Sequence, residues 1–261
     1  MTQLSEFVLF EKLDGHVAVV TLNRPEKLNA VNAAITEGLD AAVKAVEADP
    51  DIWIAILTSS NDRMFCAGAD LAEAAKGNHS ALATKDGGFA GFVDHPRTKI
   101  WIAAPKGVTA GGGLELCLAC DMIVAADNCT FGLTEAKRGL VAAAGGAIRL
   151  GKKIPLGIAV EMIATGDPID AQRAYTLGLV NRIAKPADTL NAAIEFAKAI
   201  TANAPLAVRE AVRLVKESQT ESDEEGRRMT QAARLRVMAT EDSKEGVRAF
   251  IEKRPPQWVG R

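Results

Sequence analysis

The stretch Val108-Thr109-Ala110-Gly111-Gly112-Gly113-Leu114-Glu115-Leu116 joins a short β-prone run to an apolar helical run through three consecutive glycines. A chain that turns from a strand into a helix leaves the first N–H groups of the helix without intrahelical partners. A ligand can approach such groups closely where there is no Cβ, and the positive end of the helix dipole favours an anion there. Glu115 falls in the first turn of the predicted helix and can reach the same space. The residues alone equally allow a structural interpretation, in which the glycines permit close packing and Glu115 is an ordinary N-terminal helix acid.

Two further segments also combine small residues with a turn that follows a predicted strand. Met64-Phe65-Cys66-Ala67-Gly68-Ala69-Asp70-Leu71 follows a strand that ends near Thr58, and Asp70 can cap the helix after it. Phe131-Gly132-Leu133-Thr134-Glu135-Ala136 places a second glutamate after a short strand and a turn. A single glutamate in such a loop is most often a solvated residue, so this segment indicates a functional site only in combination with the other two segments.

Strand-like and helix-like segments alternate through the first two-thirds of the chain. Residues 32–48 have apolar side chains at helical spacing. From about Pro155 onward helical patterns dominate, with one short strand expected at 179–183. We therefore predict an α/β core with near-parallel buried strands over residues 1–195, followed by a helical region over residues 196–261. The main strands of this core are expected at four β-rich or continuously apolar stretches, namely 17–22, 52–57, 99–104 and 122–126.

The charge balance excludes some classes of partner. The 261 residues include 31 Lys and Arg and 33 Asp and Glu, and the formal net charge is −2. This gives no electrostatic reason to expect nucleic acid or an anionic membrane as a partner. No apolar run is long enough to span a bilayer, and no secretory signal pattern opens the chain. The four cysteines lack the spacing of a disulfide framework, so we expect a reducing, cytoplasmic location, with Cys117 and Cys120 as core residues.

Several common catalytic motifs are missing from the sequence. The three histidines, His16, His79 and His95, form no H-E-x-x-H pair, so a zinc hydrolase is not expected. There is no G-x-S-x-G elbow and no phosphate-binding P-loop motif. The glycine run lacks the last glycine of a dinucleotide fingerprint, where Leu116 stands instead. We therefore expect neither a metal nor a redox cofactor.

Taken together, the three segments resemble the signatures of the enoyl-CoA hydratase (crotonase) superfamily. Ala67 to Asp70 is similar to the family's A-G-A-D motif, and Gly111 to Leu116 is similar to its G-G-G-x-E-L motif. Glu135 follows Glu115 by 20 residues, as the second glutamate does in the family. The resemblance covers nearly the whole chain in the expected order, and continues through Asn23-Arg24-Pro25, Thr165-Gly166, Gly178-Leu179-Val180 and residues 250–254.

The resemblance implies a crotonase-type spiral of ββα units with a helical C-terminal region that builds homotrimers, often paired into hexamers. It implies that the N–H groups of Ala69 and Gly112 form an oxyanion hole and that Glu115 and Glu135 are the catalytic carboxylates. Coenzyme A would enter as part of an acyl-CoA substrate rather than as a prosthetic group. The residues expected to bind the CoA and the substrate are Arg24, Lys27, Leu28, Ala30, Ala67, Asp70, Leu71, Gly111 and Lys253.

The pair of glutamates makes an enoyl-CoA hydratase the leading functional hypothesis. Such an enzyme adds water reversibly to the 2,3-double bond of an enoyl-CoA and gives a 3-hydroxyacyl-CoA. Gly87-Gly88-Phe89-Ala90-Gly91 and the ending Arg254 to Arg261 are also similar to carnitinyl-CoA dehydratases, which have the same two glutamates. An enoyl-CoA isomerase of the superfamily, in which Glu115 would be surplus, is a further alternative. A non-catalytic RNA-binding or scaffold relative is the alternative from another class, and the near-neutral charge counts against it.

Two positions depart from the family's usual pattern. Thr134 stands where the family often has a proline before its second glutamate. After Leu140, Val141-Ala142-Ala143-Ala144 replaces a common proline-containing loop. Both changes lie next to Glu135, so they predict a reshaped wall beside that glutamate.

Overall fold

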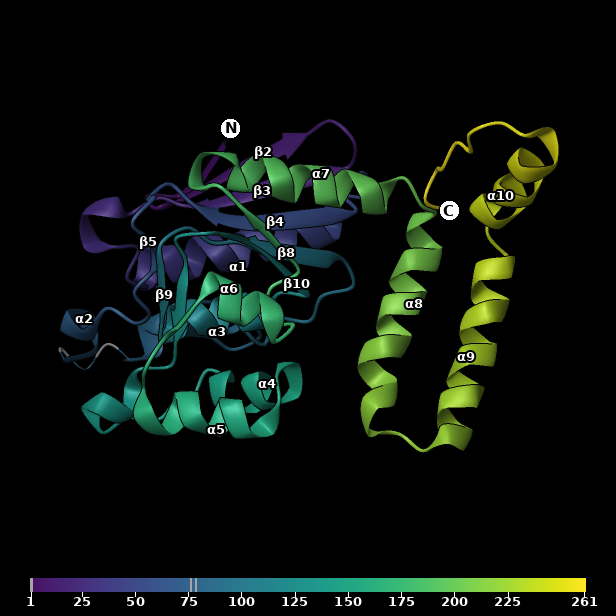
Figure 1. Ribbon diagram of the computed structural model, residues 1–261. Helices are drawn as coiled ribbons and strands as arrows, with labels where there is room; N and C mark the ends of the chain where they lie inside the picture. The colour runs from purple at the N-terminus through teal and green to yellow at the C-terminus, as the bar shows by residue number, and fades with distance from the viewer. Residues whose placement is uncertain (1, 76, 78) are drawn as a thin grey trace. The chain divides into compact units, whose positions relative to one another are not determined.

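The structure is a computed structural model that describes residues 2–75, 77 and 79–261 (Figure 1). The chain divides into two compact units, Met1–Glu195 and Phe196–Arg261. The first unit is a mixed α/β unit, and the second is helical. No helix in the described part of the chain combines the length and apolar character needed to cross a bilayer.

A seven-stranded sheet forms the larger layer of the first unit, in the order β1-β2-β3-β4-β8-β10-β13. The N-terminal strands β1, β2 and β3 pair in antiparallel fashion, whereas the pairs from β3 to β13 are parallel. Parallel strands are usually covered on both faces, which explains why β4 and β8 are buried along their whole length. The strands are Thr2–Ser5 (β1), Val8–Leu13 (β2), Val17–Leu22 (β3), Ile54–Ser59 (β4), Ile100–Ala104 (β8), Met122–Ala126 (β10) and Arg182–Ala184 (β13).

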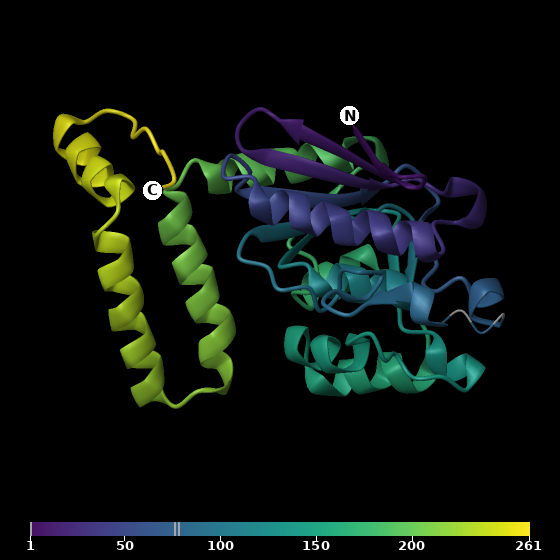
Figure 2. The same cartoon turned by 180° about the vertical axis from the view of Figure 1, so that it is seen from behind.

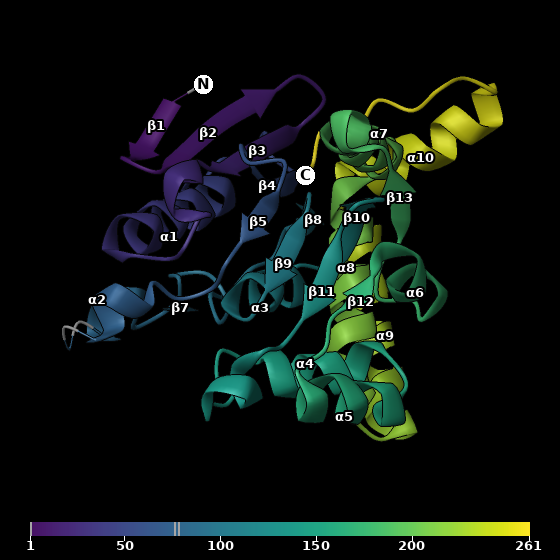
Figure 3. The same cartoon turned by 60° about the vertical axis from the view of Figure 1, so that its left-hand side comes forward.

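A second, four-stranded sheet has the order β12-β11-β9-β5. Its strands are Met64–Cys66 (β5), Val108–Ala110 (β9), Thr130–Gly132 (β11) and Ile169–Asp170 (β12). The strands β5, β9 and β11 are the next strands along the chain after β4, β8 and β10 of the large sheet, respectively. Since β9 pairs in parallel with both β5 and β11, the carboxyl ends of these three strands meet at one edge. The three sequence segments singled out above all lead to that edge (Figure 3).

Helices follow the strands and complete the first unit. The helix α1 (Ala33–Ala48) packs against β1, β2 and β3, and the Asn32 side chain caps it by accepting a hydrogen bond from the Ile35 amide at 3.0 Å (Figure 2). The strands β6 (Ala83–Thr84) and β7 (Gly88–Phe89) form a separate two-stranded antiparallel sheet. The other helices are α2 (Leu71–Ala75), α3 (Gly112–Ala119), α4 (Gly146–Lys153), α5 (Leu156–Thr165), α6 (Ala171–Thr176) and α7 (Thr189–Thr201), whose last residues belong to the second unit.

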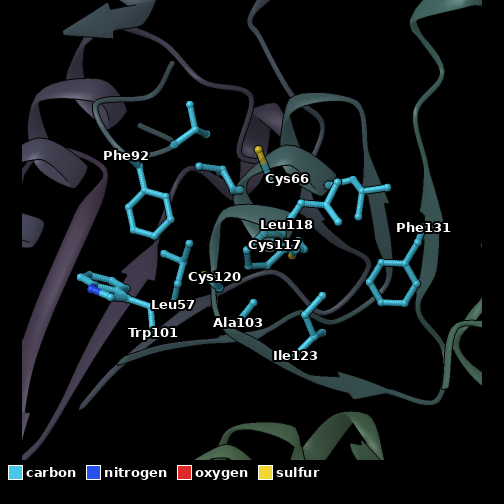
Figure 4. Close-up of a cluster of buried hydrophobic side chains, with 14 of the residues drawn as sticks. Leu57, Cys66, Phe92, Trp101, Ala103, Cys117, Leu118, Cys120, Ile123 and Phe131 are labelled. Atoms are coloured by element: carbon cyan, nitrogen blue, oxygen red, sulfur yellow. The ribbon is translucent and has the colours of Figure 1, made fainter. Parts of the chain in front are cut away.

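The core of the first unit surrounds α3, which is buried from Gly112 to Leu118. Leu114, Leu116 and Cys117 of this helix are fully buried. Trp101 of β8 meets Phe92 edge to face, with ring centroids 5.0 Å apart (Figure 4). All four cysteines are buried and unpaired with one another, and burial raises the pKa of the Cys117 thiol well above its usual value. The prediction that Cys117 and Cys120 are core residues is therefore confirmed.

The second unit consists of the end of α7 and the helices α8 (Pro205–Glu217), α9 (Asp223–Met238) and α10 (Glu241–Glu252). Glu210 of α8 accepts hydrogen bonds from Arg236 of α9, at 2.8 Å for the shorter contact. The chain end folds back so that Asp242 accepts hydrogen bonds from the amides of Val259 and Gly260. Several large apolar side chains remain exposed in this unit, above all Phe250 at 86% and Ile251 at 73%.

The structure confirms the predicted α/β class and its four main strands, but it moves some boundaries. The strand expected at 52–57 runs from Ile54 to Ser59, because its pairing with β3 starts at Val17 opposite Ile54. The strand expected at 179–183 is shorter and later, at Arg182–Ala184, where it pairs with β10. The short strands expected before the glycine run and before Glu135 correspond to β9 and β11, whereas β1, β2, the short strands β5 and β12, and the helices α4 and α10 were not predicted. Elements of two or three residues have too few positions to show a periodicity.

Candidate functional site

A cavity of about 650 Å³ lies at the carboxyl ends of β5, β9 and β11. Its volume falls in the usual range for a small-molecule site. The turns after these strands contribute small residues and two acids, including Ala69, Gly112, Glu115 and Glu135. Larger apolar side chains complete the lining, namely Met64, Leu71, Leu82, Phe89, Leu140 and Val141. The parallel pairing of three short strands thus brings together segments that are far apart in the sequence.

The amide of Ala69 faces this cavity because its neighbours are bonded on the other side. Val31 forms an isolated parallel bridge with Ala69. The Val31 N–H donates to the Gly68 carbonyl at 2.8 Å, and the Asp70 N–H donates to the Val31 carbonyl at 2.9 Å. Successive N–H groups in an extended chain point to opposite sides, so the Ala69 N–H points away from Val31. Within residues 2–75, 77 and 79–261 this amide has no hydrogen-bond acceptor.

The three glycines of the run, Gly111 to Gly113, have different structural roles. Gly111 has φ 54 and ψ −127, a backbone conformation that residues with a Cβ rarely adopt, and its N–H donates to the Gly132 carbonyl at 2.9 Å. Gly112 begins α3, and its amide has no acceptor among the residues that the structure describes. A Cβ on Gly68 would lie 2.8 Å from the Gly112 nitrogen, so the two turns are in close contact. A Cβ on Gly113 would lie 2.1 Å from the Cys66 carbonyl oxygen, so Gly113 is a packing glycine.

The two interpretations of the glycine run therefore apply to different residues. Close packing explains Gly113, whereas the Gly112 amide opens on the cavity together with the Ala69 amide. The ring of Phe89, from the β7 strand, covers this place: a Cβ on Gly112 would lie 2.7 Å from the Phe89 Cε1 atom. Phe89 belongs to the segment that resembles carnitinyl-CoA dehydratases, but it was not predicted as a site residue. Its contact with Gly112 is visible only in the folded chain.

Glu115 lies in the first turn of α3 and is buried, with 4% of its surface exposed. Its Oε1 atom accepts a hydrogen bond from the Gly146 N–H at 2.9 Å. Burial, with a smaller contribution from the charge of Glu135, raises the pKa of Glu115 from 4.5 to about 6, although the Gly146 hydrogen bond opposes the shift. A carboxyl group in this range can both hold and release a proton near neutral pH.

Glu135 opens the 3₁₀ turn η3 (Glu135–Arg138) and is half-buried. Its Oε2 atom is buried and has no hydrogen-bond partner among the described residues. A Cβ on Gly111 would lie 3.1 Å from Oε1 of Glu135, so this carboxyl group faces the glycine turn. Burial raises the pKa of Glu135, and the nearby charge of Arg138 opposes that shift. An unpartnered buried carboxyl oxygen is the kind of acceptor that a substrate or a water can satisfy.

The burial of Glu115 makes a prediction for stability. Because its pKa is raised on folding, its contribution to the free energy of unfolding is fully present below pH about 4.5 and is lost as the pH rises through about 6. The loss corresponds to about 2 kcal/mol. The free energy of unfolding of Glu115→Gln, measured relative to that of the unchanged protein, should therefore be about 2 kcal/mol more favourable to the folded state at pH about 7 than at pH about 4.5. Urea unfolding at both pH values measures this, with Glu37→Gln on the exposed side of α1 as the matched control. Equal differences at the two pH values would contradict the buried carboxylate.

The predicted binding residues lie in three parts of the chain. Among the residues that the structure describes, Ala67, Leu71 and Gly111 line the cavity beside the predicted oxyanion and acid residues. The loop of residues 24–30 lies beside it, since the Ala67 N–H donates to the Leu28 carbonyl at 3.1 Å. Lys27 and Leu28 are exposed there. Lys253 belongs to the second unit, where it ends α10 in the left-handed conformation at φ 55.

Arg24 and Asp70, both predicted to bind CoA, form an ion pair with each other. Nη1 of Arg24 lies 2.7 Å from Oδ2 of Asp70, and their side chains are only 11% and 13% exposed. The same Nη1 donates to the Ala30 carbonyl at 2.9 Å. Arg24 lowers the pKa of Asp70, which also caps α2 through the amides of Ala72 and Glu73. The opposite charges of this pair neutralise each other. The ion pair also holds the loop of residues 24–30 against the turn that contains Ala69.

Arg149 is a second residue that the sequence did not single out. Nη1 of Arg149 donates to the Ala144 carbonyl at 2.9 Å, and Nη2 donates to the Val93 carbonyl at 2.7 Å and to Asp94 at 2.9 Å. It thereby links the loop that supplies the Gly146 amide to Glu115 with the segment that follows Phe89. A basic residue inside a helical pattern gives no signal of such a link in the sequence.

Similarity to known proteins agrees with this geometry. The family model described as enoyl-CoA hydratase/isomerase matches residues 12–261. A carnitinyl-CoA dehydratase from Proteus mirabilis is 39% identical over 252 residues, which cover 95% of this chain and 96% of that protein. The crystal structure of an enoyl-CoA hydratase from Mycobacterium tuberculosis has a TM-score of 0.93 at 44% identity, and covers 97% of this chain and 99% of that one.

A more distant solved structure has the same fold. The enoyl-CoA hydratase from Bacillus anthracis has a TM-score of 0.90 at 33% identity, and covers 98% of this chain and 100% of that one. Matches over nearly the full length of both partners leave no large part of the fold without a counterpart. The chain therefore belongs to the enoyl-CoA hydratase/isomerase family and is a crotonase-superfamily enzyme, whose family acts on CoA thioesters.

Proposed function

We propose that this protein is an enoyl-CoA hydratase, which adds water reversibly to the 2,3-double bond of an enoyl-CoA thioester and gives a 3-hydroxyacyl-CoA. One observation carries the proposal: two glutamates whose pKa values are raised by burial line the same cavity as two amides without acceptors among the described residues. A thioester-conjugated double bond needs both an anion site for its carbonyl oxygen and groups that deliver and remove protons.

The amides of Ala69 and Gly112 supply the anion site. In the proposed complex both N–H groups donate to the thioester oxygen, which gains negative charge as water attacks C3. Donors that are already oriented cost no reorganisation at that moment, and removing one such donor from an oxyanion hole costs about 2.7–4 kcal/mol in other enzymes. Gly112 contributes the additional positive end of the α3 helix dipole.

Glu115 and Glu135 supply the proton transfers. We infer that they hold one water between them, and that between them they carry a single proton. One carboxylate removes a proton from the water as its oxygen bonds to C3, and the other carboxyl group gives a proton to C2. The two electrons of the double bond form the new C2–H bond, so no oxidant or reductant takes part. Two neighbouring carboxyl groups titrate as a pair, so the pH profile reports the pair rather than one residue.

The same geometry supports a second candidate, the dehydration of a 3-hydroxyacyl-CoA. The 39% identity to a protein named carnitinyl-CoA dehydratase favours this candidate. Dehydration uses the same two acids and the same anion site in reverse. An isomerase needs only the acid at position 135, so the buried position of Glu115 in the cavity counts against it.

Steady-state kinetics with a substrate panel tests the proposed function. The panel contains crotonyl-CoA and longer 2-enoyl-CoAs, 3-hydroxybutyryl-CoA, carnitinyl-CoA and a 3-enoyl-CoA. We expect formation of 3-hydroxyacyl-CoA from the 2-enoyl substrates and the reverse reaction from 3-hydroxybutyryl-CoA. Turnover of the 3-enoyl-CoA alone would establish an isomerase instead, and no turnover of any thioester would exclude the hydratase.

Lys253 is proposed to contact the CoA phosphates, as its family position implies. Lys253→Ala should then raise KM for CoA substrates several-fold with little change in kcat, because the contact is made equally in the ground state and the transition state. Lys244→Ala removes a second exposed charge of α10 and is the matched control. Steady-state kinetics with crotonyl-CoA gives both constants. A KM equal to that of the control variant would remove Lys253 from the site.

The region of residues 196–261 is proposed as an oligomerisation element that builds a trimer or a hexamer. Its exposed apolar side chains support this proposal, since Leu235, Met238, Val247, Phe250 and Ile251 are all more than half exposed. Large exposed apolar groups of this kind usually mark a protein interface. Light scattering at micromolar concentration should give a mass of three or six chains, and a stable monomer would contradict the proposal.

A further inference from the structure

Arg138 gives the cavity an unusual charge pattern. Among the described residues that line the cavity, the charged side chains are Glu115, Glu135 and Arg138, so Arg138 is the one cation. It ends the same 3₁₀ turn that Glu135 begins, and its charge acts on the pKa of Glu135. The two glutamates and one guanidinium leave the cavity close to neutral once the acids share a proton.

The guanidinium is held in place without being neutralised. Nη1 of Arg138 donates to Oγ1 of Thr134 at 3.0 Å and to the Thr134 carbonyl at 3.3 Å. Across the described residues it has no carboxylate within ion-pair distance, unlike its neighbour Lys137, which lies 2.6 Å from Asp167. A threonine where the family often has proline thus supplies the hydroxyl group that orients Arg138. The remaining N–H donors of the guanidinium are available to a ligand.

The position of Arg138 places it beside the acyl part of a bound thioester. In the proposed complex the thioester oxygen lies at the Ala69 and Gly112 amides, and C2 and C3 lie between the glutamates. In that complex the atoms beyond C3 pass Glu135, and the lining residues that follow Glu135 along the chain are Arg138, Leu140 and Val141. The cation is therefore near the acyl chain rather than near the reacting bond.

We propose that Arg138, oriented by Thr134, makes the enzyme select acyl groups by charge, so that a carboxylate-terminated acyl chain binds best and a trimethylammonium-terminated chain binds worst. This inference rests on the proposed function and specifies its substrate class. A quaternary ammonium group is usually bound by an aromatic cage, and Phe89 is the only aromatic side chain in the lining, as far as the structure describes it. A carboxylate, in contrast, can accept two hydrogen bonds from one guanidinium.

Three saturated thioesters of equal length test the proposal without depending on turnover. Valeryl-CoA, glutaryl-CoA and γ-butyrobetainyl-CoA differ only in a terminal methyl, carboxylate or trimethylammonium group. Isothermal titration calorimetry on the full chain gives the three dissociation constants. We expect glutaryl-CoA to bind at least roughly tenfold more tightly than γ-butyrobetainyl-CoA. At this partly exposed site the Arg138 guanidinium attracts the glutaryl carboxylate and repels the trimethylammonium group, and both effects add to the difference.

Matched variants assign this preference to Arg138. Arg138→Leu should reduce the ratio of the dissociation constant of γ-butyrobetainyl-CoA to that of glutaryl-CoA by roughly tenfold. Arg138→Lys keeps the positive charge and should keep most of that ratio. Thr134→Val, which removes the orienting hydroxyl group, should reduce it by a smaller factor. Lys137→Leu removes the adjacent cation outside the cavity and should leave the ratio unchanged.

Other outcomes would overturn the proposal. An unchanged ratio in Arg138→Leu would show that the guanidinium does not contact the acyl end. An equal loss of affinity for all three ligands would assign Arg138 to the CoA phosphates instead. Failure of the unchanged protein to bind valeryl-CoA would contradict the proposed function itself, whereas normal binding of valeryl-CoA with no charge preference would overturn only the role of Arg138.

Discussion

Glu115→Gln and Glu135→Gln should each lower kcat for hydration by roughly 10²–10⁴-fold, the usual contribution of one acid–base group. Each substitution keeps the shape of the side chain but removes its ability to exchange a proton. In Glu115→Gln the new amide group can still accept the hydrogen bond from the Gly146 N–H through its oxygen, so the fold should be kept. Glu37→Gln, on the exposed side of α1, is the matched control.

The double variant separates a shared mechanism from two independent effects. If both carboxyl groups hold the same water, the fold loss of kcat in the double variant should be much smaller than the product of the two single fold losses. The effects of residues that act as a unit are not additive. A product assay for 3-hydroxyacyl-CoA on the four proteins measures this, beside an assay of double-bond migration. Full hydration by Glu115→Gln, with loss of isomerisation only in Glu135→Gln, would overturn the two-glutamate mechanism.

Gly112→Val should lower kcat by roughly 10²–10³-fold, the usual cost of losing one oxyanion donor. A Cβ at this position would first meet the Phe89 ring at 2.7 Å and the Gly68 Cα at 3.1 Å. The new side chain therefore acts by displacing Phe89 and the two turns that present the amides, and not only by filling the place of the thioester oxygen. Adding Phe89→Leu should restore part of the activity, because the ring is one of the two groups that must move.

Gly113→Ala provides the contrast for Gly112→Val. Its Cβ would lie 2.1 Å from the Cys66 carbonyl oxygen, a backbone atom that cannot turn away, so the expected loss is in stability. Urea unfolding and crotonyl-CoA kinetics on both variants distinguish the two roles. If Gly112→Val folds normally and keeps full turnover, Gly112 is a packing glycine like Gly113, and the oxyanion hole needs another donor.

The positions of Glu115 and Glu135 in the cavity were predictable from the sequence because their motifs are local. Gly111 to Leu116 specifies a strand end, a glycine turn at positive φ and a helix start within a few residues, and the place of Glu115 follows from that. The long strands of the large sheet were predictable for a similar reason, since a continuous apolar run such as residues 52–57 is typical of a buried parallel strand. Their exact limits depend on the pairing partner, which explains the two-residue error at the start of β4.

The predicted charges around the site show where local patterns are insufficient. Arg24 and Asp70 are 46 positions apart, and the sequence gives no reason to pair them. Once folded they neutralise each other at 2.7 Å, so their role as CoA contacts stays a prediction with a competing structural task. Lys27 remains exposed in the same loop, where its charge is not taken up by that pair.

By itself the sequence determined the α/β class and the glycine turn, and it predicted the two glutamates that line the cavity, because each is encoded by neighbouring residues. Only the tertiary structure decided the environment of those groups. The parallel pairing of β5, β9 and β11 brings three turns to one edge, the Gly146 amide at the start of α4 donates to Glu115, and the η3 turn places Arg138 on the cavity wall. A pKa depends on burial and on partners that are distant in the chain, and burial is a property of the packed molecule.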